Sequence, residues 1–186
     1  MDRLVIKQIL GNEQVTQYYV VSLIGKTLVL LIAPINTIVI SYLTKRKERL
    51  TRSQFGKAVL AGGGVSLVFF VACQIGTPLF VWLFYRNLYE SVKGIVTVVN
   101  LAQILGLFSA FLFILVLTFT DERWQLWIQL VHFCILLVSS VLAARTYGMM
   151  GFAVASLGAN SLRVAAVVIL GIVKAGKDKG DRNADR

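Results

Sequence analysis

Long apolar runs alternate with short polar segments along almost the whole chain. Each run has about 19 residues or more, enough for an α-helix rising 1.5 Å per residue to cross the ~30 Å hydrocarbon core of a bilayer. A continuous helix satisfies its own backbone hydrogen bonds in lipid, so the pattern predicts about five transmembrane helices. Their approximate limits are Tyr18–Leu43, Ala58–Tyr85, Gly94–Phe119, Leu126–Ala144 and Met149–Val173.

The composition agrees with this interpretation. Of the 186 residues, 57% are hydrophobic and 15% are charged, and the mean hydropathy is +0.76. A water-soluble domain of this size needs far more polar surface, so we expect an all-α integral membrane protein. Residues 1–17 are mixed in polarity and are interpreted as the stub of a preceding helix with an external loop. Residues 18–173 form the predicted five-helix lobe, and residues 174–186 a basic tail.

Positive charge is concentrated in two of the segments outside the runs. Cytoplasmic segments of membrane proteins collect Lys and Arg, so both are predicted to lie inside and the N-terminus outside. We expect the chain to lie in the cell membrane and to contact its lipids. Nucleic acid is not an expected partner, because the charges lack interleaved stacking aromatics. The two segments contain Lys45, Arg46, Lys47, Arg49, Arg52 and Lys57, and Lys174, Lys177, Lys179, Arg182 and Arg186.

Two full charges lie inside the apolar runs, and both are cations. Lys26 is in the first run and Arg163 is near the centre of the fifth, whereas no Asp or Glu lies in any run. A charge in lipid is costly and marks a functional hypothesis. Cations without carboxylate partners indicate that these residues bind an anionic ligand reversibly. Two alternatives stay open: Lys26 snorkels to the outer headgroups, or Arg163 binds carbonyl groups of a broken neighbouring helix.

Polar residues within the runs share helix faces with these cations. Ser22, Asn36 and Thr37 fall on the face of Lys26, and Ser156 and Asn160 precede Arg163 at i, i+4, i+7 spacing. Such stripes are expected to face the bundle interior rather than lipid, although single polar residues more often form helix–helix hydrogen bonds. The predicted cavity-lining residues are Ser22, Asn36, Thr37, Asn100, Gln103, Ser156 and Asn160.

Signatures of enzymes and metal sites are absent from the sequence. Cys73 and Cys134 lack the spacing of metal ligands, and His132, the only histidine, has no acidic neighbour in the apolar runs. Paired carboxylates and a phosphate-binding glycine loop are also missing. We therefore expect a non-enzymatic protein without a metal or cofactor. Aromatic residues near the run ends are interpreted as interfacial anchors: Tyr18, Tyr19, Trp82, Tyr85, Trp124, Trp127 and Tyr147.

Several short stretches resemble the C-terminal half of polysaccharide biosynthesis flippases, which are lipid-linked oligosaccharide exporters related to MATE-type multidrug transporters. The resemblance runs along essentially the whole chain, and its motifs are diffuse. The stretches are Asp2-Arg3-Leu4-Val5-Ile6, Leu10-Gly11, Tyr18-Tyr19 with Lys26, Ala33-Pro34-Ile35-Asn36, Ser41-Tyr42-Leu43, and Tyr147-Gly148-Met149-Met150-Gly151-Phe152-Ala153-Val154-Ala155-Ser156 with Asn160 and Arg163.

The resemblance implies one lobe of a two-lobed bundle that moves undecaprenyl-diphosphate-linked sugars across the membrane by alternating access. Lys26 and Arg163 would then contact the diphosphate. The family's N-terminal lobe has no counterpart here, so the implied partner is that lobe or a second copy of the chain. Two other functions stay open: a lobe of a multidrug or cation antiporter, and a non-transporting, truncated partner in a glycan-assembly complex.

Overall fold

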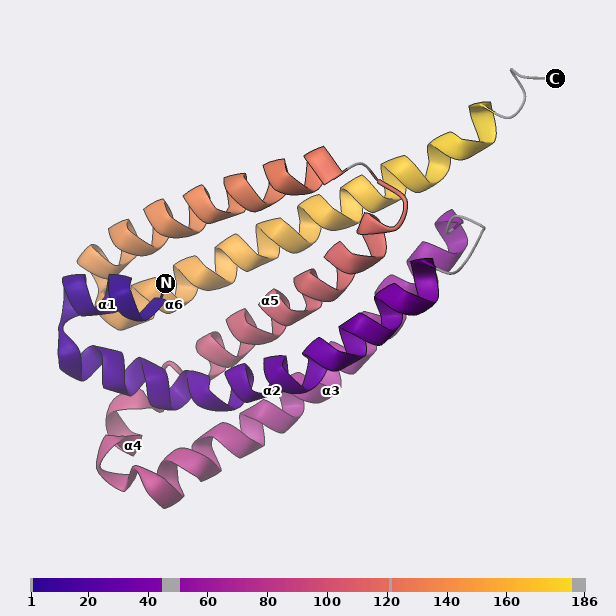
Figure 1. Ribbon diagram of the computed structural model, residues 1–186. Helices are drawn as coiled ribbons and strands as arrows, with labels where there is room; N and C mark the ends of the chain where they lie inside the picture. Colours follow the sequence, from indigo (N-terminus) through magenta and orange to yellow (C-terminus); the bar gives the residue numbers. More distant parts are fainter. Residues whose placement is uncertain (1, 45–50, 121, 182–186) are drawn as a thin grey trace.

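The computed structural model describes residues 2–44, 51–120 and 122–181, and all elements in these ranges are α-helices (Figure 1). No strand occurs in the described part of the chain. The expectation of an all-α protein is therefore confirmed. The helices are α1 (Asp2–Leu10), α2 (Asn12–Thr44), α3 (Arg52–Phe84), α4 (Arg86–Val92), α5 (Val96–Leu117) and α6 (Glu122–Asp181).

The longest helix, α6, is bent back on itself at one residue. Gly148 has φ 62° and ψ −144° and divides α6 into two helices, here called the first arm (122–147) and the second arm (149–181). The arms run antiparallel and side by side (Figure 1). Gly148 lies between the fourth and fifth predicted runs. The turn also requires Gly151, because a Cβ atom there would lie 2.1 Å from the carbonyl oxygen of Ala143.

Three described helical segments are long and apolar enough to cross a membrane: Arg52–Phe84, Val96–Leu117 and Arg123–Ala175, the last interrupted by Gly148. The outer surfaces of α3 and the first arm expose large apolar side chains, as contact with lipid requires. These include Leu67, Val68, Ile75, Leu126 and Trp127. The protein is thus membrane-embedded, whereas the number of five crossings stays a prediction.

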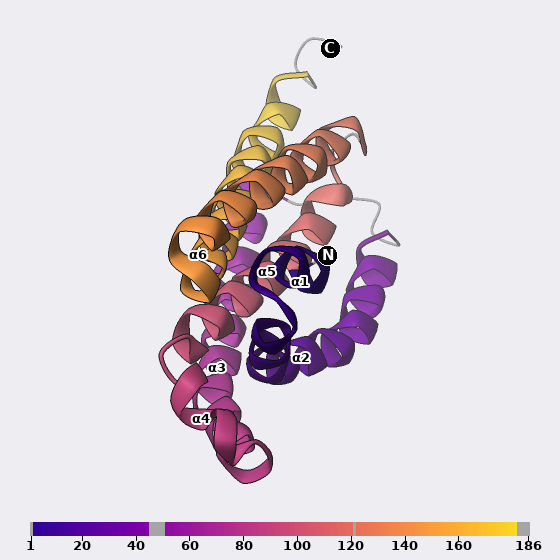
Figure 2. The same ribbon diagram turned by 90° about the vertical axis from the view of Figure 1, so that its left-hand side faces the viewer.

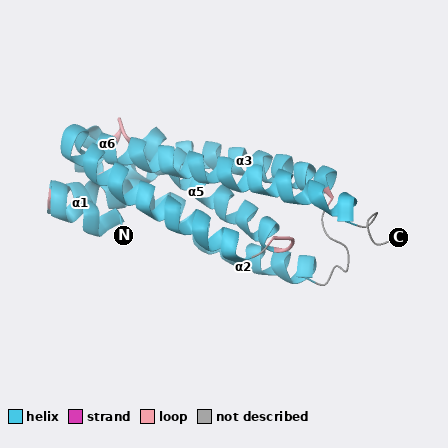
Figure 3. Cartoon of the chain, turned by 90° about the horizontal axis from the view of Figure 1, so that it is seen from above, coloured by secondary structure: helices cyan, strands magenta, loops and turns pink. Residues whose placement is uncertain are grey.

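Helix α5 lies at the centre of the bundle. It packs against α2, α3 and α6, whereas α2 and α6 have little direct contact with each other (Figures 2 and 3). In its most apolar stretch 44% of the residues are buried within the protein, against 6% in α3. Most sides of α5 therefore contact other helices of the protein. Helix α5 therefore lies between α2 on one side and α6 on the other.

Two apolar clusters close the two ends of this arrangement. The first lies at the end that contains Gly148 and α4; there the rings of Tyr18 and Phe152 pack edge to face at 5.2 Å. The second, at the opposite end, contains Phe55, Leu112, Leu115, Val116 and Val167. Phe55 lies so close to α6 that a Cβ atom on Gly171 would be 2.2 Å from its ring. The polar side chains lie between the clusters.

Residues 2–17 form α1 and the first turns of α2. Gly11, with φ 93°, joins the two helices, so α2 begins at Asn12, earlier than the apolar pattern indicated. Helix α1 packs against both α2 and α6. Its Ile6 side chain is fully buried, and the Arg3 guanidinium lies 4.1 Å from the centre of the Tyr19 ring. The segment interpreted as a stub is therefore part of the packed bundle.

The described parts of the two basic segments lie at one end of the bundle. The last turns of α2 and α5, the first turns of α3 and α6, and the C-terminal end of α6 all lie there (Figure 1). Lys174 at this end lies 5.6 Å from the Trp124 ring. The topology and the orientation in a membrane stay predictions. Lys45, Arg46, Lys47, Arg49, Arg182 and Arg186 lie outside the described residues.

Candidate functional site

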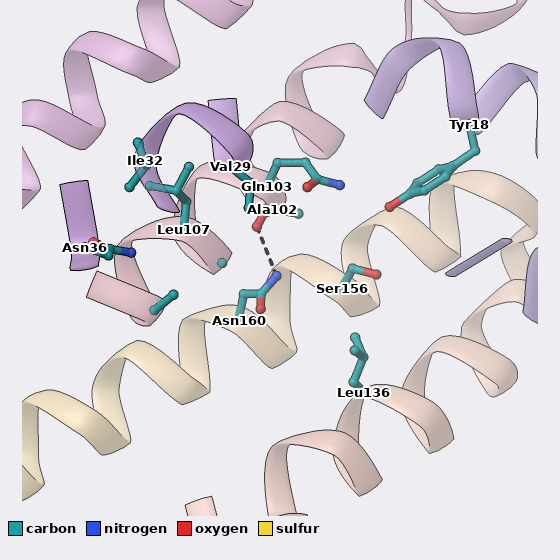
Figure 4. A pocket seen from close by; sticks show the side chains of 12 residues that line it. Tyr18, Val29, Ile32, Asn36, Ala102, Gln103, Leu107, Leu136, Ser156 and Asn160 are labelled. Carbon is teal, nitrogen blue, oxygen red and sulfur yellow. Dashed lines mark hydrogen bonds between the residues drawn. The ribbon is translucent and has the colours of Figure 1, made fainter. Parts of the chain in front are cut away.

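A pocket of about 300 Å³ lies between α2, α5 and the two arms of α6, in the layer between the two apolar clusters (Figure 4). The close-up shows polar side chains from α2, α5 and the second arm around this space, with Leu136 of the first arm at its side. Its walls are therefore built from helices far apart in the sequence. The lining residues are Tyr18, Val29, Ile32, Asn36, Ala102, Gln103, Gly106, Leu107, Ala110, Leu136, Ser156 and Asn160.

One hydrogen bond fixes the second arm to α5 at the pocket. The Asn160 side-chain amide donates to the Ala102 carbonyl at 3.0 Å (Figure 4). The two helices are in close contact here, since a Cβ atom on Gly106 would lie at van der Waals distance, 3.4 Å, from the Asn160 amide nitrogen. One turn earlier, Ser156 is also buried. The bond orients the Asn160 amide and leaves its carbonyl oxygen as an acceptor on the pocket wall.

The opposite wall is formed by α2, which approaches α5 closely at Gly25. A Cβ atom on Gly25 would lie 2.9 Å from the Cβ atom of Gln103. On the same wall, the buried Asn36 Oδ1 has no hydrogen-bond partner. A buried acceptor without a donor is costly. This atom is therefore suited to a ligand that brings a donor, such as a hydroxyl group.

The two cations lie on opposite walls, and neither lines the pocket. Lys26 Nζ lies 5.5 Å from the centre of the ring of Tyr18, which does line it. The Arg163 guanidinium carbon lies 5.5 Å from the centre of the Phe113 ring of α5, one helical turn beyond Asn160. Arg163 Nε is buried without a hydrogen-bond partner. Each cation thus packs on its own aromatic ring at the margin of the pocket.

Four of the seven predicted cavity-lining residues meet at this pocket: Asn36, Gln103, Ser156 and Asn160. Of the others, Thr37 is exposed on α2. Ser22 is fully buried, and its hydroxyl donates to the Tyr19 carbonyl at 3.2 Å. Asn100 lies at a different helix contact and is described next.

Asn100 is itself fully buried and joins α5 to α3 through a hydrogen-bond network. Its side-chain amide donates to the Cys73 carbonyl at 3.1 Å and to Gln74 Oε1 at 3.0 Å. Its side-chain oxygen accepts a hydrogen bond from the Thr77 hydroxyl at 3.2 Å. All its polar atoms are therefore paired within the protein, which is the helix–helix role that single polar residues in spans usually have. Gln74 extends the network to Thr97 at 2.9 Å.

Sequence reasoning placed Tyr18 at a membrane interface, but its side chain is only 2% exposed and its ring lines the pocket. The small residues Ala102, Gly106 and Ala110 were also not singled out. Their four-residue spacing on one helix face was the available signal. No group of three or more potential metal-ligating side chains occurs among the described residues.

Comparison of the chain with protein-family models, curated proteins and solved structures found no match. The resemblance to the flippase family therefore depends on the quoted residues alone. It stays a prediction.

Proposed function

We propose that this chain is one lobe of a membrane transporter that flips a polyprenyl-diphosphate-linked oligosaccharide, such as an undecaprenyl-diphosphate-linked sugar, for cell-surface polysaccharide synthesis. The resemblance suggested this substrate class. The physical support is a polar pocket inside an otherwise apolar bundle, with a cation at the margin of each of two facing walls and no carboxylate within the apolar runs.

In this proposal the lobe has five crossings. Helices α2, α3 and α5 are three of them, and Gly148 divides α6 into the other two. Each arm exceeds the length of about 20 residues that a crossing requires. The antiparallel course of the arms returns the chain to the end from which α6 started (Figure 1).

The chemistry of the pocket suits a sugar attached to a lipid. The amides of Asn36, Gln103 and Asn160 and the hydroxyl of Ser156 can donate and accept hydrogen bonds without adding charge. Sugar hydroxyl groups need this kind of partner. Val29, Ile32 and Leu107 supply apolar surface beside them. A site with amides and aliphatic side chains can therefore hold a sugar close to a prenyl chain.

The cations are assigned to the diphosphate. Because Lys26 and Arg163 lie on opposite walls and pack on different rings, we propose that they contact the diphosphate in succession as the lipid moves. A guanidinium can bind phosphate oxygens in bidentate fashion, so Arg163 would hold it more tightly. A cationic drug would be repelled at both positions, which disfavours an antiporter. The second lobe, from another chain or another copy, would close the pocket.

The test is binding of a polyprenyl-diphosphate-linked sugar to the chain in lipid nanodiscs, for the parent protein, Lys26→Gln and Arg163→Gln. We expect affinity to fall about tenfold or more for Arg163→Gln, because charge-assisted hydrogen bonds contribute ~1.5–3 kcal/mol. Arg145→Gln is the matched control, since Arg145 is exposed near Gly148 and far from the pocket along α6. Equal binding by the parent and all three variants, or binding of a cationic dye instead, would contradict the proposal.

A further inference from the structure

Two buried nitrogen atoms on facing helices lack partners, and both belong to side chains that can carry positive charge. They are Arg163 Nε on the second arm and His132 Nε2 on the first arm. In the part of the chain that the structure describes, only two other buried side-chain nitrogen or oxygen atoms have no hydrogen-bond partner, and they are in Asn36 and Gln125.

The turn at Gly148 brings these residues to the same height. His132 lies about 16 residues before Gly148 and Arg163 about 15 residues after it, so at ~1.5 Å per residue they are level in the antiparallel pair. The electrostatic interaction between the two side chains agrees with this register, as does the closeness of Asn160 to His132. The Phe113 ring of α5 lies below Arg163.

The pair lies beside the pocket rather than at a separate surface. Leu136, one turn from His132, and Asn160, one turn from Arg163, both line the pocket. Both residues of the pair are partly exposed. A ligand in the pocket could therefore reach them through a local movement of side chains.

We propose that His132 and Arg163 together form a binding site for a phosphate group and that His132 takes up a proton when the phosphate binds. As a statement about the transported lipid, the inference rests on the proposed flippase function. Lys26, on the opposite wall, is not part of this site.

The proton uptake follows from the charges around His132. Arg163 faces it from the second arm, where it is the only titratable residue between Met149 and Val173; α5 supplies none between Val96 and Leu117. Two neighbouring cations repel each other strongly at low dielectric, whereas an anion between them is attracted by both. The doubly cationic pair is therefore favoured with phosphate bound, and the linkage requires tighter phosphate binding at lower pH.

The test uses two probes in nanodiscs, at pH about 5.5 and about 8, which bracket the ordinary titration of histidine. One probe is a farnesyl-diphosphate-linked N-acetylglucosamine, and the other is a dialkyl phosphate without sugar. Both keep a constant charge over this range, so a change in affinity reports on the protein. Because His132 is the only histidine, His132→Gln isolates its contribution, and Arg145→Gln controls for loss of one positive charge.

We expect both probes to bind the parent protein about tenfold more tightly at the lower pH, as uptake of one proton allows. This pH dependence should disappear in His132→Gln and persist in Arg145→Gln, and Arg163→Gln should weaken binding at both pH values. Binding of the sugar lipid that is insensitive to pH and to His132 would overturn the inference and leave the proposed function intact. Binding of the dialkyl phosphate alone, with the expected pH dependence, would support the anion site and contradict the flippase proposal. No binding of either probe would overturn both.

Discussion

Replacing Asn100 by Leu tests whether the buried network is what holds α3 against α5. The substitution keeps the side chain at about the same size and removes three hydrogen bonds: one from the Thr77 hydroxyl, one to the Cys73 carbonyl and one to Gln74. Hydrogen bonds between helices in a membrane contribute on average ~0.6 kcal/mol each. The sum predicts a loss of about 2 kcal/mol in the free energy of unfolding, or roughly a 25-fold change in the folding equilibrium.

The loss should not be much larger, because the groups left behind have other partners. The Thr77 hydroxyl can donate to a carbonyl of its own helix one turn earlier. Gln74 keeps its bond to Thr97. In a double-mutant cycle with Thr77→Val, we therefore expect a coupling energy close to that of one such bond, ~0.6 kcal/mol.

The assay is reversible unfolding in mixed detergent micelles, followed by circular dichroism. Thr27→Val is the matched control, since the exposed Thr27 hydroxyl bonds only to the Leu23 carbonyl of its own helix, at 2.9 Å. The control should change the free energy of unfolding by less than about 0.5 kcal/mol. An Asn100→Leu protein as stable as the parent would refute the network as a stabilising contact, and a coupling energy of zero would refute the Thr77 bond.

Two further predictions concern other contacts. Gly25→Val should lower the free energy of unfolding by about 1–3 kcal/mol because the added carbon atoms overlap Gln103; Gly64→Val, with nothing within 4 Å of its Cβ position, should cost much less in the same assay. At the surface, the hydrogen bond and ion pair with Glu90 raise the pKa of Lys93 above its ordinary value of 10.5. The contribution of this ion pair to the free energy of unfolding is fully present below that value and is lost as pH rises through the raised pKa. The thermal unfolding midpoint should therefore fall slightly at alkaline pH, and this fall should be absent in Glu90→Gln.

The apolar pattern was sufficient to predict the long helices but not their neighbours. Run length identifies a helix, whereas in lipid both the packed and the outward faces are apolar, so periodicity does not show which side is buried. This is why Asn100 and Gln103, three residues apart on α5, were predicted to line one cavity but point to different contacts. Gln103 lines the pocket, and Asn100 binds α3.

The relation between His132 and Arg163 was beyond sequence reasoning for a different reason. Their closeness depends on where α6 turns, and a change in the turn position by two residues would rotate one arm by about half a helical turn relative to the other. The predicted runs leave residues 145–148 for the turn without fixing its position, and the structure places it at Gly148. Arg163 was identified because a charged residue in an apolar run can be recognised from the sequence alone. His132 could be assigned to a site only after the structure placed Arg163 opposite it.

The single-residue turn at Gly148 also has a consequence for biosynthesis. With no loop between the arms, the two helices of the proposed five-crossing lobe must enter the membrane together as a hairpin. An Arg at the centre of an isolated helix opposes insertion by about 2.5–3.5 kcal/mol, and each Leu, Ile, Phe or Val favours it by ~0.3–0.6 kcal/mol. The Leu-, Ile- and Val-rich first arm would thus carry Arg163 into the bilayer. Polar substitutions in the first arm should therefore cause the second arm to fail to insert, even where they touch nothing in the folded protein.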